Sequence, residues 1–221
     1  MTIAILKQAL IGSLLSLACS ATVVADSHAS TAMIDAISRL QADWAEVNYQ
    51  LDGDAQINAF VELIAVADRV VAEYPKAAPA YIWRGIIQST YAGAKGGIGA
   101  LKFAKAAKAD LEQSLELDPE AMNGSAYTSL GTLYLNVPGW PIGFGSDKKA
   151  EQLLLKALNL NPDGIDSNYF YASYLQSKGR DQEAKGVFLK AQGAAPRAHR
   201  PLADAGRQKE IAEALAALDP E

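Results

Sequence analysis

Residues 150–162 read Ala-Glu-Gln-Leu-Leu-Leu-Lys-Ala-Leu-Asn-Leu-Asn-Pro, and this stretch carries the helical pattern that recurs along the chain. Ala150, Leu154 and Ala157 have the spacing i, i+4, i+7, which places them on one stripe of a helix, and Pro162 ends that helix. The same order of small residue, large apolar residue, small residue and proline recurs twice: in Ala107, Leu111, Ser114 and Pro119, and in Ala184, Phe188, Ala191 and Pro196. Three copies of one helical stripe indicate a repeat architecture.

A second helix precedes each copy of the stripe, and it carries large apolar residues beside a small one. These residues are Tyr81 with Gly85, then Tyr127 with Leu130, Gly131 and Tyr134, then Tyr171 with Ala172 and Leu175. The small residues let the two helices of one unit approach closely. The repeat unit is therefore predicted to be a pair of antiparallel helices, and the pairs stack along the chain.

This layout resembles the tetratricopeptide repeat (TPR) family, whose helix-turn-helix unit has a period of 34 residues. Pro162 and Pro196 are 34 residues apart, and Gly179 falls at the turn between the two helices. The two earlier units, which end at Pro119 and Pro162, are longer by about ten and seven to nine residues. The resemblance implies an all-α fold: a TPR-like right-handed superhelix of stacked antiparallel helix pairs, with enlarged insertions and a C-terminal capping helix.

The same pattern organises residues 26–221 as a single TPR-like domain. We expect a degenerate N-terminal helix pair at 30–75, followed by repeats at 78–119, 124–162 and 165–196, and a solvating cap helix at 202–218. In the N-terminal pair, the spacing places these apolar residues inside: Met33, Ile34, Ile37, Leu40, Trp44, Val47, Ile57, Phe60, Val61, Ile64 and Val71.

Residues 1–25 have the features of an export signal peptide. Lys7 is the only charge, residues 9–18 are mostly apolar, and Val23-Val24-Ala25 supplies small residues for cleavage before Asp26. The apolar run is shorter than the ~20 residues that span a bilayer, which favours cleavage over a retained anchor. A lipoprotein anchored through Cys19 is the alternative, and only that lipid would tether the protein to a membrane. The expected location is the periplasm.

Composition and residue pattern argue against several functions. The net charge of −5 and the lack of a basic face argue against a nucleic-acid binder. Cys19 is the only cysteine, so the cleaved chain has no thiol for catalysis, disulfides or metal binding. His28 and His199 lack metal-ligand spacing, and helix capping accounts for Asp163, Asp166 and Asp181. We therefore expect no catalytic residues, no metal, no cofactor and no enzymatic activity.

An apolar loop, Val137-Pro-Gly-Trp-Pro-Ile-Gly-Phe-Gly145, is the strongest candidate for function. Turns between TPR helices are usually short and polar, whereas this one contains Trp140, Pro141 and Phe144. Two interpretations stay open. The aromatic residues either tuck back over the neighbouring helices as a plug, or form a lip for a ligand or peptide.

TPR arrays usually bind their ligands on the inner face of the first helix of each pair. By alignment of the repeats, that face carries Ile82, Ile86, Ser89, Thr90, Thr128, Thr132, Leu135, Asn136, Tyr169, Ser173, Gln176 and Ser177. The face is mixed polar with few charges, and the basic carboxylate clamp of chaperone-binding TPR domains is absent. Together with the loop, the resemblance gives these candidate binding residues: Trp140, Pro141, Phe144, Tyr134, Asn136, Tyr169, Ser173 and Gln176.

The main interpretation is an exported scaffold that binds a partner protein or peptide. A narrower resemblance, carried by residues 136–150 and the export signal, is to the T-component proteins associated with periplasmic TRAP transporters. It implies the alternative function: an accessory of a TRAP-type transporter that assembles with a substrate-binding protein and shields a hydrophobic small ligand.

Overall fold

The structure, a computed structural model, describes the backbone of residues 16–219 and the side chains of residues 31–219. The chain divides into two compact units, Met1–Ala36 and Ile37–Glu221. Helix α1 (Ser16–Gln50) begins in the first unit. The predicted signal peptide, with Cys19 and the cleavage site, lies outside the residues whose side chains are described. Across the described range, no helix combines the length and the apolar character that crossing a membrane requires.

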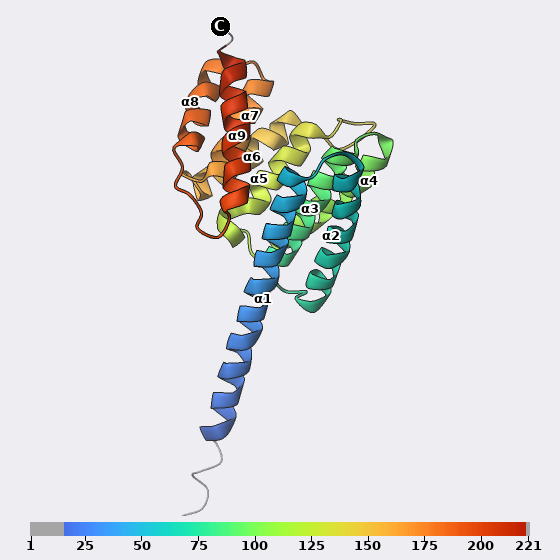
Figure 1. Ribbon diagram of the computed structural model, residues 1–221, viewed down its shortest axis with the longest axis vertical. Helices are drawn as coiled ribbons and strands as arrows, with labels where there is room; N and C mark the ends of the chain where they lie inside the picture. Colours follow the sequence, from blue (N-terminus) through green and yellow to red (C-terminus); the bar gives the residue numbers. More distant parts are fainter. Residues whose placement is uncertain (1–15, 220–221) are drawn as a thin grey trace, which may run out of the picture. The chain divides into compact units, whose positions relative to one another are not determined.

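The second unit is built from helices that pack against their neighbours in the chain (Figure 1). After α1 follow α2 (Gly53–Glu73), α3 (Ala78–Lys95), the short 3-10 helix η1 (Ile98–Ala100), α4 (Leu101–Leu117), α5 (Ala121–Asn136), α6 (Asp147–Leu160), α7 (Ile165–Ser177), α8 (Asp181–Gln192) and α9 (Pro201–Leu218). The main pairs are α3 with α4, α5 with α6 and α7 with α8, and α9 packs on α8 and α7. Residues 16–219 contain no strand, so the predicted all-α architecture of stacked helix pairs is confirmed.

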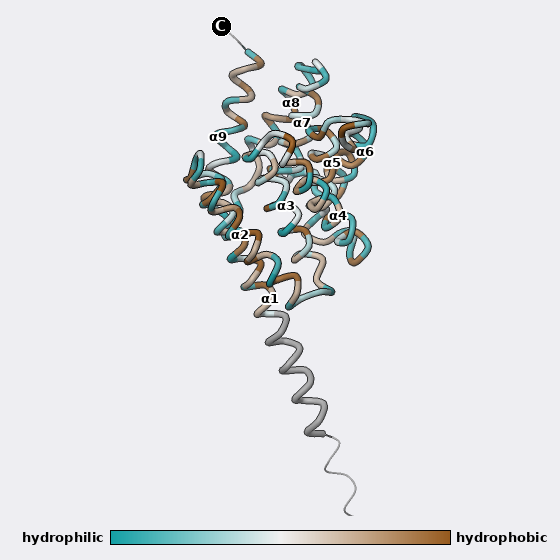
Figure 2. Tube along the Cα trace, turned by 90° about the vertical axis from the view of Figure 1, so that its right-hand side faces the viewer, coloured by the Kyte–Doolittle hydropathy of each residue, from teal (hydrophilic) through white to brown (hydrophobic). Residues whose placement is uncertain are grey.

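The repeated stripe forms the centre of the core. All nine of its residues are fully buried: Ala107, Leu111, Ser114, Ala150, Leu154, Ala157, Ala184, Phe188 and Ala191. Helices α4 and α6 end two residues before Pro119 and Pro162, as predicted. Along the helices of this unit, hydrophobic and hydrophilic residues alternate in short runs (Figure 2), as expected for helices that bury one face.

A glycine explains how closely the paired helices α3 and α4 approach. A Cβ atom on Gly85 of α3 would lie 2.8 Å from Leu111 Cγ of α4 and 3.2 Å from the Ala107 carbonyl oxygen. The predicted close approach at the small residues is therefore confirmed, because a side chain at this position would separate the helices.

Some details of the predicted interior were wrong. Ile34 and Val61 are 55% and 51% exposed, although the helical spacing placed both inside. In α2 the buried positions are Phe60, Leu63, Ala67, Val70 and Val71, so Val61 falls on the flank of the buried stripe.

The insertions also differ from the expected loops. Helix α3 continues to Lys95, and only then do Gly96 and Gly97, with φ of +61° and +67°, break it. At the start of α5, Met122, Asn123 and Gly124 have left-handed backbone angles, so the regular helix begins at Ser125. A Cβ on Gly124 would lie 2.7 Å from Leu160 Cδ1, so glycine suits this position for both its space and its φ of +76°.

The C-terminal helix is more than a solvating cap. Its observed start, Pro201, agrees with the predicted one within a residue, but Ala203, Asp204, Arg207 and Ile211 are buried. The charged members of this set belong to a polar cluster inside the unit.

Candidate functional site

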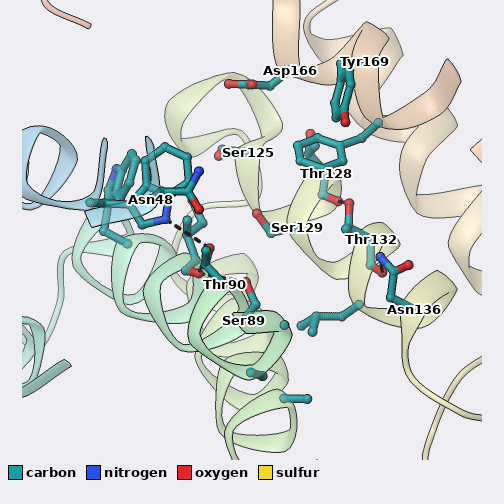
Figure 3. A pocket seen from close by; sticks show the side chains of 18 of the residues that line it. Asn48, Ser89, Thr90, Ser125, Thr128, Ser129, Thr132, Asn136, Asp166 and Tyr169 are labelled. Carbon is teal, nitrogen blue, oxygen red and sulfur yellow. Dashed lines mark hydrogen bonds between the residues drawn. The ribbon is translucent and has the colours of Figure 1, made fainter. Parts of the chain in front are cut away.

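The second unit encloses a cavity of about 1060 Å³. Its wall comes from the end of α1 and from α3, α5 and α7, and Figure 3 shows their polar side chains around the opening. Residues of the predicted inner face that line it are Ile86, Ser89, Thr90, Thr128, Thr132, Asn136 and Tyr169. Ile82, by contrast, is fully buried in the core. The repeat register therefore places most of this face correctly.

The hydroxyl groups on this wall are oriented by their own helices. Ser89 and Thr90 donate to the Ile86 carbonyl at 2.8 and 2.9 Å, and Thr132 donates to the Thr128 carbonyl at 2.9 Å. Asn136 Nδ2 donates to the Thr132 carbonyl at 3.0 Å. A hydroxyl has one donor and two acceptor lone pairs, so Ser89 and Thr132 keep acceptors for the cavity. Thr90 Oγ1 already accepts from Trp44 Nε1 at 3.0 Å.

Another part of the wall is a cluster of charged residues around Asp166, in the first turn of α7. Asp166 Oδ2 accepts from Arg197 Nη1 at 2.6 Å, and Asp166 Oδ1 accepts from Arg207 Nε at 2.9 Å. Arg197 also donates from Nε and from its backbone N–H to Asp204, both at 2.6 Å. Arg207 donates in addition to Glu210. The cluster thus joins α7 to α9 and to the segment before it.

Ionisation in the cluster follows from these contacts. Burial opposes the charge on Asp166, but the positive charges of Arg207, Arg197 and Arg200 prevail and hold the pKa of its carboxyl below the usual value. Burial also opposes the charge on Glu210. There it outweighs the attraction of Arg207 and raises the pKa of the Glu210 carboxyl. We had expected helix capping to account for Asp166; this was wrong, because Gly164 is the N-cap and the carboxylate binds arginines instead.

Aromatic rings surround the arginines of the cluster. The Arg207 guanidinium carbon lies 4.2 Å from the centre of the Tyr169 ring and 4.6 Å from that of Phe170. The Arg200 guanidinium lies 5.1 Å from the centre of the Trp83 ring. These distances are within the range of cation–π attraction, which holds the side chains against the wall.

Tyr49 of α1 closes the cluster from the other end of the unit. A Cβ on Gly206 of α9 would lie 2.4 Å from the Tyr49 ring. Glu210 of α9 is near enough to act on the ionisation of the Tyr49 hydroxyl. Burial, and to a smaller extent the charge of Glu210, raises the pKa of Tyr49 to about 12. Helices α1 and α9 therefore contact each other beside the cavity.

The two insertions form part of the rim. Gly97, Ile98 and Ala100 line the cavity from one insertion, and Val137, Pro138 and Ile142 line it from the other. Ile98 is 97% exposed, and Ile142 is exposed as well. The rim thus exposes two large apolar side chains.

The structure separates the two aromatic residues of the apolar loop. The Phe144 ring packs edge-on against Tyr134 with 5.4 Å between ring centres, and Lys108 Nζ lies 5.8 Å from the ring centre. Trp140, on the other hand, is 89% exposed. Phe144 therefore packs back over a neighbouring helix, as the plug interpretation requires, whereas Trp140 does not.

The remaining predicted binding residues fall in three places. Asn136 and Tyr169 line the cavity, and with Ser173 they also line a neighbouring pocket of about 430 Å³. Tyr134 is buried in the core, and Pro141 is exposed beside Trp140. Gln176 is partly buried and lines neither pocket.

The sequence analysis missed the residues of the charged cluster. The available signal was the presence of three arginines, Arg197, Arg200 and Arg207, shortly after the last repeat proline. The position of these arginines in the folded unit depends on the packing of α9 near α1, and no spacing in the sequence predicts that packing. Among the described residues, no group of three or more His, Cys, Asp or Glu side chains could hold a metal ion.

Comparisons with known proteins bear on the fold. No protein-family model and no curated protein matches the chain. Among solved structures, the chain is similar to TTC0263, a thermophilic TPR protein in Thermus thermophilus, with a TM-score of 0.53 and 19% sequence identity over 73% of this chain and 90% of that one. A second structure, YrrB, described as a TPR protein with an unusual peptide-binding site, aligns with a TM-score of 0.41 and 18% identity over 76% of this chain and 81% of that one. The similarity to TTC0263 shows that the chain has a TPR fold.

Proposed function

We propose that this protein is an exported, non-enzymatic scaffold that binds an extended segment of a partner protein in its cavity. The observation that carries the proposal is the wall of the cavity, where oriented hydroxyl and amide groups present acceptors. Ser89 and Thr132 have committed their hydroxyl protons to helix carbonyls, and Asn136 has committed part of its amide. The backbone N–H groups of an extended peptide are donors that match these acceptors.

The rim supports a protein partner. Ile98 and Ile142 expose apolar surface where they line the cavity, and Trp140 is exposed two residues before Ile142 in the chain. Tryptophan is enriched among residues that dominate binding energy at protein interfaces. A partner whose segment enters the cavity would cover this surface.

Export remains part of the proposal because of residues 1–25. Their positive charge, apolar run and small residues before Asp26 favour delivery to the periplasm, so the partner would itself be an exported protein.

Site-specific photo-crosslinking tests this function in cells. A photoreactive amino acid at Asn136, which lines the cavity, should trap one discrete partner protein. The matched control is the same amino acid at Glu116, which is exposed on α4 and lines neither pocket. Identical adducts at both positions, or none at Asn136, would contradict the proposal.

A small apolar molecule is a second candidate ligand, as expected of a transporter accessory. The cavity volume of about 1060 Å³ is close to the upper end of the ~300–1,000 Å³ common in small-molecule sites. Native mass spectrometry of protein purified from the periplasm distinguishes the two candidates. One bound molecule of constant mass favours the small ligand, and ligand-free protein with a crosslinked partner favours the scaffold.

A further inference from the structure

Arg200 differs from the other two arginines of the charged cluster. Arg197 and Arg207 each contact two carboxylates at hydrogen-bond distance. Arg200 Nη1 comes no closer than 4.0 Å to Asp166 Oδ2. Within residues 31–219, its Nε atom is buried and has no hydrogen-bond partner.

The carboxylates of the cluster already accept hydrogen bonds from other residues. Both oxygens of Asp166 accept from Arg197 and Arg207, and both oxygens of Asp204 accept from Arg197. Glu210 accepts from Arg207. Arg200 is therefore a cation in the cavity wall whose nearby anions are engaged elsewhere.

The surroundings of Arg200 make it energetically unfavourable to leave its N–H donors without acceptors. Burial, followed by the positive charge of Arg197, lowers the pKa of Arg200, so its environment disfavours the charge that it carries. The guanidinium lies against Trp83, whose Nε1 is also a buried donor without an acceptor. A buried donor left unpaired costs roughly 1–3 kcal/mol, and an incoming acceptor removes that cost. The Arg200 side chain keeps 17% of its surface exposed, which leaves room for contact from the cavity.

We propose that Arg200 binds a carboxylate group of the ligand that occupies the cavity, an inference that rests on the proposed function. A guanidinium offers two parallel N–H donors that match the two oxygens of a carboxylate. One carboxylate is the right complement, because Asp166, Asp204 and Glu210 accept from Arg197 and Arg207 and leave the donors of Arg200 free. In a peptide, the carboxylate is either the C-terminus or an Asp or Glu side chain.

Nuclear magnetic resonance of the full chain tests the anion site without knowledge of the partner. The protein is labelled with ¹⁵N-arginine, and the Arg200 Nε–H signal is assigned by its loss in Arg200→Gln. Benzoate should shift this signal, whereas neutral benzamide should not. The Nε–H signal of Arg180, which is exposed and bound to Glu183, should move with neither probe. The absence of a benzoate shift at Arg200, or an equal shift with benzamide, overturns the proposal.

Peptide pools identify the source of the carboxylate and test the proposed function separately. Three random hexapeptide pools are passed over immobilised protein: one without Asp or Glu but with a free C-terminus, one amidated and containing Asp and Glu, and one amidated without them. Wild-type protein should retain at least one acidic pool about tenfold more than the amidated acid-free pool. Arg200→Gln should remove this preference, and Arg180→Gln should keep it.

The outcomes separate the two claims. Equal retention of all pools by wild-type protein overturns the role of Arg200 and leaves peptide binding intact. Retention of no pool, together with a benzoate shift, contradicts the scaffold function and supports a site for a small carboxylic acid. The acidic pool that is retained shows whether the carboxylate belongs to the chain end or to a side chain.

Discussion

Gly131 of α5 lies so close to Leu154 of α6 that a Cβ atom on the glycine would be 2.6 Å from Leu154 Cγ and 3.2 Å from the Ala150 carbonyl oxygen. Gly131→Leu should therefore force the helices apart and lower the free energy of unfolding by about 1–3 kcal/mol or more. In a chain of this size, thermal denaturation should show a decrease in Tm of about 2–4 °C for each kcal/mol.

A matched pair of alanine variants isolates the packing term. Gly131→Ala places its Cβ against Leu154, whereas Gly186→Ala, in α8, places its Cβ in open space. The first should lower Tm, and the second should leave it unchanged or raise it, because alanine is favoured over glycine in a helix by up to about 1 kcal/mol. Equal behaviour of the two variants would show that the α5–α6 packing is wrong.

The apolar loop should divide into a structural and a binding residue. Phe144→Ala removes a ring that packs on Tyr134 and should cost about 1–3 kcal/mol of stability, less than a fully buried phenylalanine. Trp140→Ala should change stability by less than about 0.5 kcal/mol, because the side chain is 89% exposed, but it should weaken crosslinking of the partner at Asn136. Urea denaturation and crosslinking yield measure the two effects.

Leu189→Ala is the control for this pair, because Leu189 is a half-exposed apolar residue on α8 that lines neither pocket. It should affect crosslinking little. A Trp140→Ala protein that melts early yet still binds its partner normally would show that Trp140 has only a structural role.

The export signal predicts the start of the mature protein. Cleavage after Ala25 should give a periplasmic protein that begins at Asp26. Intact-mass measurement and N-terminal sequencing of protein from fractionated cells check this. A lipid-modified Cys19 at the N-terminus would establish the lipoprotein alternative instead.

Repeated local spacing explains what could be predicted from the sequence. The stripe of Ala150, Leu154 and Ala157 recurs at fixed offsets, so one helical period predicts the buried face of three helices. The same register predicts the inner face, and Thr132 and Asn136 line the cavity as expected. These features depend only on residues within about one helix of each other.

The rest of the site depends on contacts between distant parts of the chain. Tyr49 and Glu210 meet only because the array closes on itself, and hydrophobic periodicity carries no information about that closure. In the loop, Trp140 and Phe144 have similar apolar character, and only the course of the backbone leaves Phe144 partly buried and Trp140 exposed.

Asp166 provides the sharpest test of the charged cluster. Asp166→Asn keeps the shape of the side chain but removes the charge that Arg197 and Arg207 share. The Asp166 side chain is 30% exposed and Arg207 is 8% exposed, so loss of the carboxylate leaves a largely buried charge uncompensated, and the variant should lose about 1–3 kcal/mol of stability at pH 7. Asp163→Asn is the matched control, since Asp163 pairs with Lys190 while 89% exposed, and it should cost less than about 1 kcal/mol.

The pH dependence follows from the lowered pKa of Asp166. The folded state binds the proton less tightly than the unfolded state, so the contribution of Asp166 is fully present above its ordinary pKa of 3.8 and is lost as the pH falls below that value. Urea denaturation at pH 7 and at pH 3 should therefore show a smaller difference between wild type and Asp166→Asn at the lower pH. The Asp163→Asn protein should follow wild type at both values. If Asp166→Asn matches wild type at pH 7, or if its deficit grows in acid, the carboxylate does not hold the arginines of the cavity in place.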